Sequence, residues 1–522
     1  MNRDKNSSQY QIARGQYFTP RYIADYMVGM LESSRESLIL EPSSGEGVFI
    51  DALQAQGFNR IMAYEIDRSL IKHSCVKNES FVSVQPNFQF DAIIGNPPYV
   101  RWKNMLPESK VELNDNPIWR ANFNGLCNYF YIFILKSIKL FRHGGELVFI
   151  CPDYWISTKH ATNLRKFMLK NGCFSNIIRF HETAIFDGVN SSFMIFRYIK
   201  GGCLEHIDVI QFPKKRNLKK DTSSLNEILG HAEKFSLPQF LIDSAWTVAN
   251  KHSLHQVSLL EKICSRNDEN LVADRYPTVG DVCDIGNGMV SGLDKAFQTQ
   301  LNDQYTSEEI FSSINVAKAK HLEPYRITRL TDYIFIRGTY SENELKIRFP
   351  NFYKSLLPYR IQLDRRYNYN RNLPYWEWAF PRNYQMFRSA SKRILVPCKE
   401  RITNKDHFRF AIAESGIYPT QDVTALFKKQ HTQESLEYIA AYLNHPAVFH
   451  WVRHKGVIKG GIVEFSEKPL SSIPFRKINW NIPDEVQAHH AITCGVNNYM
   501  QTGDKFYLNH LEALFAKLGM EK

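Results

Sequence analysis

An alternation of helix-like and strand-like segments runs from about residue 20 to residue 200 and constrains the fold more than any other feature. Apolar side chains recur at helical spacing in three segments, residues 20–32, 47–57 and 127–141. Short apolar runs typical of strands lie between and after them, at residues 38–40, 61–66, 90–96, 146–152, 175–180 and 191–199. Strands that alternate with helices pair in parallel and are covered by helices on both faces. The sequence therefore predicts an α/β fold with a doubly wound, Rossmann-like sheet.

The alternation is lost after about residue 203. Residues 212–227 (FPKKRNLKKDTSSLNE) are basic and rich in Ser, which is typical of an exposed connection. The boundary between two domains is therefore expected within residues 203–245. We assign residues 1–240 to the first domain and residues 241–522, which are rich in Tyr, Arg and Trp, to a second domain of mixed α+β structure.

The amino-acid composition indicates which kinds of molecule the protein binds. The 522 residues contain 65 Lys and Arg against 53 Asp and Glu, and the net charge of +12 favours a polyanionic partner. The nine Cys residues never form a C-x-x-C pair, so neither a zinc site nor a disulfide framework is indicated, and we expect a reduced, cytoplasmic protein without a metal. The most apolar run, residues 129–141, is too short and too charged to cross a bilayer, so no membrane partner is expected.

The stretch FDAIIGNPPY, residues 90–99, ends a strand in a stiff loop. Pro97 and Pro98 lack a backbone N–H and have a fixed φ, so carbonyl oxygens of the loop are left without local partners. Asn96 adds an amide oxygen, and Tyr99 adds a flat ring. Acceptors beside a ring suit a planar group that carries an –NH₂. The alternatives are a plain strand-end turn for Asn96 and, for Tyr99, a hydroxyl that anchors the loop.

The stretch LILEPSSGEGVF, residues 38–49, has the order of strand, turn and helix at which doubly wound folds bind a ligand. Gly45 lets the backbone come close, while Glu41 and Glu46 make the turn acidic, which would repel a pyrophosphate. An acidic turn suits a cofactor with a cationic part, such as the ammonium and sulfonium of S-adenosyl-L-methionine. Glu65 ends the next strand about twenty residues after Gly45, at the position from which a carboxylate accepts the ribose hydroxyls.

These motifs, in this order, resemble the gamma class of adenine-N6 DNA methyltransferases, which includes the TaqI-type enzymes of type II restriction-modification systems. The similar segments are GQYFTPRYIADYM, LEPSSGEGVF, AYEID, GNPPY and NYFYIFILKSIKLFRHGGELVFICPDYW, and the resemblance covers almost the whole chain. It implies that the site of S-adenosyl-L-methionine is lined by Thr19, Glu41, Gly45, Glu65 and Pro98.

One motif departs from the pattern of the class. The class usually has an Asp-Phe pair upstream of the Asn of the loop, and this Asp bonds the amino group of the cofactor's adenine. Here the corresponding stretch reads NESF and places Ser80 and Phe81 in those positions. Phe81 is expected to cover the adenine ring, whereas the Asp contact is either absent or taken over by Glu79.

The resemblance also implies the reaction. The target adenine leaves the duplex by base flipping, and its exocyclic N6 amine enters the loop. Hydrogen bonds from the amine to the Asn96 side-chain oxygen and the Pro97 carbonyl would free the lone pair for attack on the methyl group, without a covalent enzyme intermediate or a metal. Tyr99 is expected to stack on the base. Phe196 is our choice for a second ring, Phe193 on the opposite strand face is the runner-up, and core packing is the alternative for both.

The second domain carries a segment, residues 357–405, in which arginines alternate with aromatic residues. Guanidinium groups neutralise phosphates and rings lie along sugars or bases, so this pattern suits double-stranded DNA. The arginines predicted to bind DNA are Arg365, Arg366, Arg371 and Arg382. A solvated basic face over an aromatic core is the alternative. The segment also resembles the target-recognition domain of these methyltransferases. We expect a modification enzyme that acts as a monomer on DNA, with a separate cognate restriction endonuclease or none.

Two other functions remain open. An Asn-Pro-Pro-Tyr loop binds any planar –NH₂, so an RNA methyltransferase or a protein-glutamine methyltransferase is the main alternative. The large basic and aromatic second domain argues against a glutamine methyltransferase, which would not need it. A non-enzymatic DNA-recognition subunit with a degenerate methyltransferase fold is a further alternative, which the presence of Asn96 and Tyr99 argues against.

Overall fold

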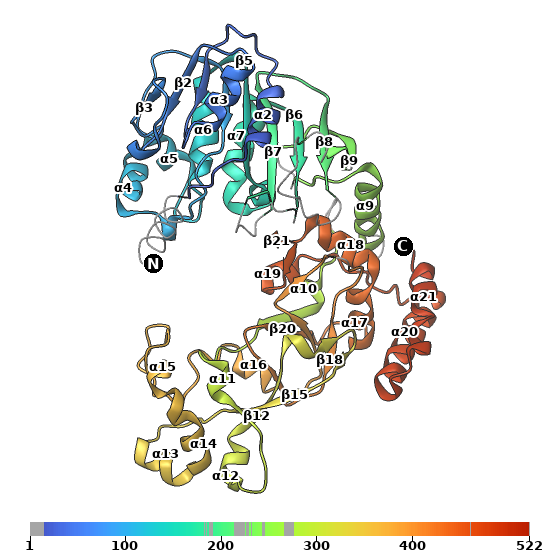
Figure 1. The fold of residues 1–522 in the computed structure, drawn as a ribbon. Coiled ribbons are helices and arrows are strands. Elements are labelled where there is room, and N and C mark those ends of the chain that lie inside the picture. The colour runs from blue at the N-terminus through green and yellow to red at the C-terminus, as the bar shows by residue number, and fades with distance from the viewer. Residues whose placement is uncertain are drawn as a thin grey trace. The chain divides into compact units, whose positions relative to one another are not determined.

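The computed structural model describes residues 15–181, 183, 185–186, 192–212, 225, 229–230, 232–242, 246–265, 276–403, 405–459 and 461–520 (Figure 1). The chain divides into two compact units. Unit 1 is Met1–Lys251 with Ile458–Gly461, and unit 2 is His252–Val457 with Ile462–Lys522. The basic connection predicted at residues 212–227 lies almost wholly outside the described residues.

Unit 1 is built on one sheet, in which nine strands are described. Their order across the sheet is β3 (Val76–Lys77), β2 (Ile61–Tyr64), β1 (Ile39–Glu41), β4 (Phe90–Gly95), β5 (Phe141–Pro152), β7 (Phe193–Lys200), β6 (Gly172–Arg179), β8 (His206–Gln211) and β9 (Glu233–Pro238). The mixed α/β character predicted from the sequence is confirmed. The carboxyl ends of β1 and β4 lie next to each other, since these two strands pair in parallel.

The direction of the strands differs from the prediction at one end of the sheet. The five strands from β3 to β5 are parallel to their neighbours, as expected. However, β7 is antiparallel to both β5 and β6, and β9 is antiparallel to β8. The prediction of an entirely parallel sheet is therefore wrong there. The sequence between β6 and β7 contains no helix-like segment, and a parallel neighbour needs a long crossover, usually a helix.

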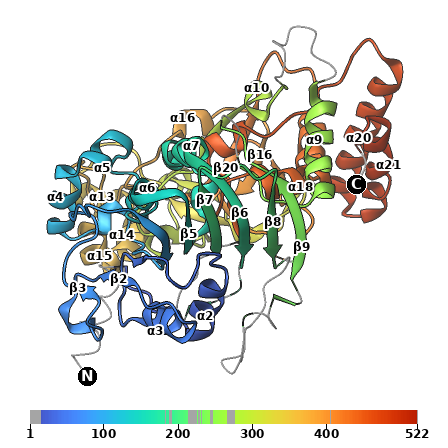
Figure 2. The same cartoon turned by 90° about the horizontal axis from the view of Figure 1, so that it is seen from above.

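Helices cover both faces of this sheet (Figure 2). One face carries α2 (Arg21–Gly29) and α3 (Val48–Ala55), whose buried residues share a core with Ile94, Val148 and Phe193. The other face carries α6 (Phe130–Leu140) and α7 (Thr162–Asn171). The remaining helices of the unit include α4 (Pro107–Asp115) and α5 (Pro117–Asn122), and α9 (Lys251–Ser265) begins at its end.

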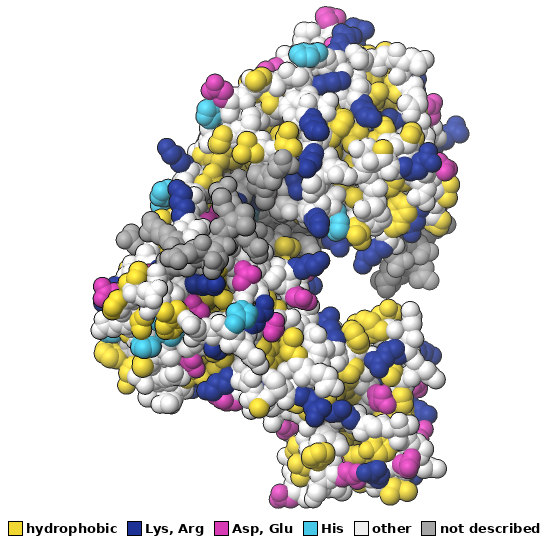
Figure 3. Space-filling model, turned by 180° about the vertical axis from the view of Figure 1, so that it is seen from behind, with side chains coloured by type: hydrophobic (Ala, Val, Ile, Leu, Met, Phe, Trp, Pro, Cys, Tyr) yellow, Lys and Arg dark blue, Asp and Glu magenta, His cyan; other side chains and the backbone are white. Residues whose placement is uncertain are grey.

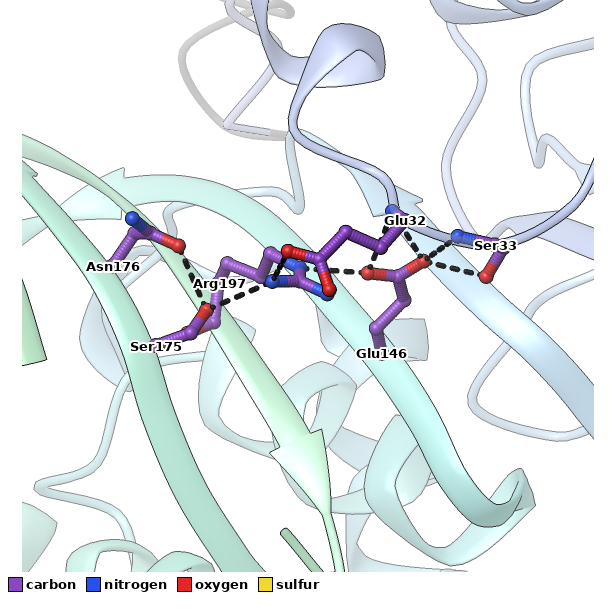
Figure 4. Close-up of polar contacts among 6 residues, drawn as sticks. All are labelled: Glu32, Ser33, Glu146, Ser175, Asn176 and Arg197. Atoms are coloured by element: carbon purple, nitrogen blue, oxygen red, sulfur yellow. Dashed lines mark hydrogen bonds and ion pairs between the residues drawn. The ribbon is translucent and has the colours of Figure 1, made fainter. Parts of the chain in front are cut away.

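A buried ionic network ties the segment after α2 to the sheet (Figure 4). The Glu146 carboxylate accepts hydrogen bonds from the backbone N–H groups of Glu32 at 3.0 Å and Ser33 at 2.7 Å. Arg197 donates through Nε to Glu146 at 2.7 Å and through Nη1 to Glu32 at 2.7 Å. The side chains of Arg197 and Glu146 are 5% and 3% exposed. Each charge is therefore stabilised by the other charge and not by solvation.

Unit 2 contains several smaller sheets. One has the order β10 (Cys283–Asn287), β20 (Val423–Lys428), β16 (Arg393–Pro397), β18 (Ala411–Ala413), and another has the order β11 (Gln298–Thr299), β15 (Leu330–Ile334), β12 (Ser313–Ala317), β19 (Ile417–Pro419). The shorter strands are β13 (Leu322–Glu323), β14 (Arg326–Ile327), β17 (Lys399–Arg401) and β22 (Ile462–Glu464), while β21 (Ile458–Lys459) is assigned to unit 1.

The helices of unit 2 are mostly short. They are α10 (Val279–Val282), α11 (Asp294–Phe297), α12 (Ser307–Phe311), α13 (Glu342–Arg348), α14 (Pro350–Leu356), α15 (Arg360–Asp364), α16 (Tyr384–Phe387), α17 (Leu436–Asn444), α18 (Pro446–Lys455), α19 (Glu467–Ser471), α20 (Pro483–Thr502) and α21 (Leu511–Lys517). Of these, α13, α14 and α15 lie together in one lobe of the unit (Figure 1).

On one face of the molecule, the distribution of charge does not single out a binding surface. On the face drawn in Figure 3, Lys and Arg side chains are spread over both units rather than gathered in one patch. Among the described residues, no helix is long and apolar enough to cross a membrane, and no cluster of His, Cys, Asp and Glu has the arrangement of a metal site. A functional site must therefore be sought in particular pockets and loops.

Candidate active site

The loop after β4 holds Asn96 in one defined orientation. The Asn96 side-chain Nδ2 donates to the carbonyl oxygen of Tyr17 at 2.8 Å and to Oγ1 of Thr19 at 3.0 Å. Its backbone oxygen accepts a bond from the Ser43 hydroxyl at 3.2 Å. Because both acceptors lie on the Nδ2 side, the amide oxygen Oδ1 is directed toward the hydroxyl of Tyr99. The predicted acceptor atom is thus oriented by partners from a distant part of the chain.

Tyr99 is held through both its ring and its hydroxyl. Its ring stacks on Tyr17 at 5.7 Å between centroids, and it meets the edge of Phe130 at 5.8 Å. The hydroxyl lies 2.6 Å from the carbonyl oxygen of Ile150 and also contacts Asn96 Oδ1. Burial raises the pKa of Tyr99 well above its ordinary value. These contacts are the ones expected of a loop anchor, and Tyr99 is not among the residues that line the adjacent pocket.

The structure places the runner-up Phe193, and not Phe196, beside Tyr99, although both rings are buried. Phe196 is fully buried and packs against Phe149, Trp155 and Phe174, on the sheet face away from Tyr99. Phe193, the runner-up, lies with its ring centroid 5.6 Å from that of Tyr99. Successive side chains of a strand point to opposite faces, so residues three apart in β7 cannot share a face. Phe193 is therefore the β7 ring that adjoins the loop.

The segment Gly15–Thr19 packs closely on the loop. Gly15 has a φ of +65°, and a Cβ atom there would lie 2.6 Å from Val100 Cγ2 and 2.7 Å from the backbone nitrogen of Tyr99. Only glycine tolerates both this conformation and this approach. Sequence reasoning selected Thr19 but missed Gly15 and Tyr17, although all three belong to the GQYFT motif. Thr19 itself contacts Asn96 and is not among the residues that line the adjacent pocket.

A pocket of about 970 Å³, counting its open mouth, adjoins the loop within unit 1. Five residues predicted from the sequence line it: Gly45, Glu65, Phe81, Asn96 and Pro98. Its wall also contains residues that were not predicted, among them Tyr17, Ile66, Leu70, Val100, Tyr129 and Phe133. The folded chain therefore brings the acidic turn, the end of β2 and the Asn-Pro-Pro-Tyr loop to a single concave site.

Glu65 fixes the acidic turn. Its carboxylate accepts a hydrogen bond from the backbone N–H of Gly45 at 2.7 Å and another from that of Asp67 at 2.8 Å. The side chain is 7% exposed and its residue lines the pocket, so one carboxylate both shapes the turn and faces the ligand space. A carboxylate has about four lone-pair positions, which leaves capacity for hydroxyl donors of a ligand.

Glu41 lies beneath this turn as a buried carboxylate without a partner. It is 1% exposed, and neither of its oxygens has a hydrogen-bond partner among the described residues. Burial, together with the nearby Glu65 and Asp51 carboxylates, raises the pKa of Glu41 well above its ordinary value. A buried carboxylate without a cation is costly, and a positive ligand group close to it would relieve that cost. Glu41 is not among the residues that line the pocket, but the wall itself carries the carboxylates of Glu65, Glu79 and Glu108. This acidic wall fits a cofactor that carries a cationic group.

Carbonyl groups at and after the end of the NESF motif, which departs from the pattern of the class, bind a lysine. Sequence reasoning missed this lysine. Lys136, in α6, is 1% exposed and donates to the carbonyl oxygens of Phe81 at 2.6 Å and Val82 at 2.9 Å, and to that of Val84. Burial lowers the pKa of Lys136 to about 8. Phe81 is 2% exposed and packs on Phe133. The signal in the sequence was a Lys at a position of the apolar helical run that lies between Leu135 and Ile138.

In unit 2 the four predicted DNA-binding arginines separate into two kinds. Arg365 and Arg371 are exposed. Arg366 instead donates to the carbonyl oxygens of Ser291 at 3.2 Å and Pro374 at 3.2 Å, and also to that of Glu377, and burial lowers its pKa. Arg382 donates through Nε to the Gly288 carbonyl at 2.8 Å. The Arg366 guanidinium is therefore engaged by carbonyl groups of the protein, whereas the Arg365 and Arg371 side chains are exposed.

Comparison with known proteins shows the family to which the chain belongs. Residues 30–186 match the family model described as Eco57I restriction-modification methylase. The chain is 46% identical over 517 residues to the type II methyltransferase M.HindII of Haemophilus influenzae, and the match covers 98% of both chains. It is 44% identical over 516 residues to the type II methyltransferase M.HincII of the same species, again over 98% of both.

Among solved structures, the fold is similar to that of the type IIL restriction-modification enzyme MmeI in complex with DNA. The TM-score is 0.62 at 9% sequence identity, and the match covers 99% of this chain and 74% of that one. At this identity the likeness concerns the fold.

Proposed function

The chain belongs to the type II DNA methyltransferases of restriction-modification systems, and on that premise we propose that it methylates the exocyclic N6 amine of adenine in double-stranded DNA. The observation that supports this most directly is the orientation of Asn96 at the pocket. Its Nδ2 is committed to Tyr17 and Thr19, so Oδ1 is presented as an acceptor, as an amine substrate requires.

Within the loop, Asn96 and Pro97 supply two acceptors for the two hydrogens of the amine. Accepting both hydrogens draws the nitrogen away from conjugation with the ring and exposes its lone pair. Because Tyr17 and Thr19 already orient the Asn96 amide, little reorganisation of this acceptor would be needed during the reaction. The target adenine has to leave the duplex to reach them, and we assign Tyr99, whose ring packs against the buried Phe193, as its aromatic neighbour.

S-adenosyl-L-methionine supplies an electrophilic methyl group when it is bound. We assign its binding to the pocket of unit 1, with Glu65 for the ribose hydroxyls and Phe81 and Pro98 for the adenine. Glu41 does not line this pocket, and we assign it to the positive charge as a buried carboxylate without a hydrogen-bond partner among the described residues. Gly45 leaves room at the turn. Glu79 and Ser80 both line the pocket, and either could replace the Asp contact that the gamma class has at this place.

The same proposal gives each unit a task. Unit 1 would be the doubly wound, Rossmann-like methyltransferase domain, and unit 2 the DNA target-recognition domain. We place the enzyme in the cytoplasm as a monomer on DNA, where it would protect sites from a separate cognate restriction endonuclease. RNA and protein glutamine remain alternative substrates for the same loop.

The test uses labelled S-adenosyl-L-methionine with duplex DNA, RNA or whole-cell protein, followed by digestion and mass spectrometry. N6-methyladenine in DNA is the expected product. N4-methylcytosine, or label only in RNA or protein, would overturn the proposal. Asn96→Ala should lower the single-turnover rate by about 10² to 10³. Asn104→Ala, at an exposed position of the nearby turn Trp102–Asn104, is the matched control and should leave the rate unchanged.

A further inference from the structure

Three aromatic rings form an exposed series on unit 2, which we call the ring ladder: Tyr367, Tyr369 and Phe380. Their exposed fractions are 68%, 39% and 36%. The centroids of Tyr367 and Tyr369 are 4.6 Å apart, and those of Tyr369 and Phe380 are 5.0 Å apart. The rings therefore contact each other instead of entering the core, and they leave apolar faces in water.

The base of the ring ladder is fixed to the body of the unit. Phe380 exchanges two backbone hydrogen bonds with Val290, each of 2.9 Å. Arg366 holds the start of the loop by donating to the carbonyl oxygens of Ser291 and Pro374. The loop between these two anchors therefore presents Tyr367 and Tyr369 on a rigid support.

The backbone under the ring ladder is strained. Tyr369 and Asn370 are consecutive residues with φ values of +58° and +59°. The left-handed region is unfavourable for a bulky side chain such as that of Tyr. Strain of this kind is typical of functional sites, and here it does not bury the Tyr369 ring, which stays on the surface.

Two cations flank the ring ladder. Arg365 and Arg371 lie two residues before Tyr367 and two residues after Tyr369, and both are exposed. Neither guanidinium makes a hydrogen bond or an ion pair with a residue that the structure describes, although Arg371 acts electrostatically on the Glu377 carboxyl. In a duplex each base face is covered by the next base, so an exposed ring reaches a base face only at a step that it partly unstacks, while exposed guanidinium groups bind phosphates.

We propose that Tyr367, the leading ring of the ring ladder, inserts at a base step of double-stranded DNA and stacks on the bases that it separates, with Arg365 and Arg371 on the neighbouring phosphates. This inference rests on the proposed function, because it takes DNA as the substrate. In this proposal the rings and the arginines of one loop contribute to DNA affinity in two different ways. The rings supply stacking, which is insensitive to salt, and the arginines supply the salt-dependent part of the affinity.

The first experiment measures DNA affinity of the full chain as a function of salt concentration, with a duplex that contains the site methylated by the wild type. Tyr367→Ala should bind about 5- to 150-fold more weakly with an unchanged salt slope, and Tyr367→Phe should bind like the wild type. Replacing Arg365 and Arg371 by Ala should reduce the salt slope by about 0.9 for each phosphate contact. Phe506→Ala removes a ring that is 59% exposed elsewhere in unit 2 and should have no effect.

The second experiment maps the contact directly. Duplexes with 5-iodouracil at successive positions are irradiated in the complex, and the cross-linked peptides are identified by mass spectrometry. Cross-links to Tyr367 or Tyr369 are expected. If Tyr367→Ala binds DNA as tightly as the wild type and the cross-links map elsewhere, the proposal is overturned. Cross-links to these rings in DNA that the wild type leaves unmethylated would support the ring ladder and overturn the proposed function instead.

Discussion

At the residue scale, the candidate active site depends on side chains that orient one another. Asn96 is aligned by Tyr17 and Thr19, and Tyr99 is aligned by Ile150 and by Asn96 itself. The position of the amide oxygen that the reaction needs therefore depends on four neighbouring residues. Substitutions that remove a single atom can separate the positioning role of each residue from its direct role.

Tyr99 offers the clearest separation. Tyr99→Phe removes the hydroxyl that donates to Ile150 and should lower the free energy of unfolding by about 0.5–1.5 kcal/mol, measured by urea titration. If the ring serves to stack on the base, this variant should still flip the target, as shown by the fluorescence of 2-aminopurine at that position. Tyr99→Ala should lose about 5- to 150-fold in flipped population. Equal loss in both variants would mean that the hydroxyl, as a loop anchor, is the essential group.

Lys136 leads to a prediction about pH. Its pKa in the folded protein is about 8, whereas an unfolded Lys titrates near 10.4. Between these values the unfolded chain binds more protons, so the contribution of Lys136 to stability increases as pH rises from about 8 to about 10.4. The difference in unfolding free energy between wild type and Lys136→Met should therefore grow over this range, measured by urea titration at several pH values. Lys139→Met, at an exposed position of the same helix, is the control. A difference that is constant with pH would contradict the prediction.

At the element scale, β7 decides which face of the sheet each of its residues serves. Phe193 and Arg197 are four positions apart in β7 and point to the face of α2 and α3, while Phe196 points to the other face. The same strand therefore contributes a ring beside Tyr99 and, through Arg197, an ion pair that reaches the end of α2. The position of α2 matters for function because the GQYFT segment precedes it directly.

The Glu146–Arg197 ion pair should contribute strongly to the free energy of unfolding. Arg197→Met leaves a buried carboxylate without its cation and should lower the unfolding free energy by about 3–5 kcal/mol in urea titration. In a double-mutant cycle with Glu146→Gln, the two losses should not add, with a coupling of about 0.5–3 kcal/mol. Arg21→Met, which breaks the exposed pair with Asp25, should cost only about 0–1 kcal/mol. Equal costs for the two arginines would refute the role of the network.

At the scale of the whole molecule, the residues that line the pocket all belong to unit 1, and the ring ladder belongs to unit 2. A fragment of residues 1–251 should therefore bind S-adenosyl-L-methionine in calorimetry with an affinity near that of the full chain. Sequence-specific DNA binding should be lost, because the arginines and rings assigned to it are absent. Specific DNA binding by the fragment would contradict this division.

The sequence by itself determined the α/β class, the order of the segments in unit 1 and the identity of the loop residues, because these depend on local patterns. Apolar periodicity, the glycines of the acidic turn and the two prolines act within a few residues of one another. For the same reason Asn96, Gly45 and Glu65 could be selected without a structure, and all three line the pocket.

The tertiary structure alone decided which residues meet across long distances in the chain. It placed Phe193 rather than Phe196 beside Tyr99, occupied Arg366 with internal carbonyl groups and set Lys136 against the carbonyls of residues 81–84. A sequence shows that an Arg or a Phe is present, but its partner is selected by strand direction, by the face of the sheet and by burial. These depend on contacts between residues as far apart as Arg366 and Ser291, which local patterns do not contain.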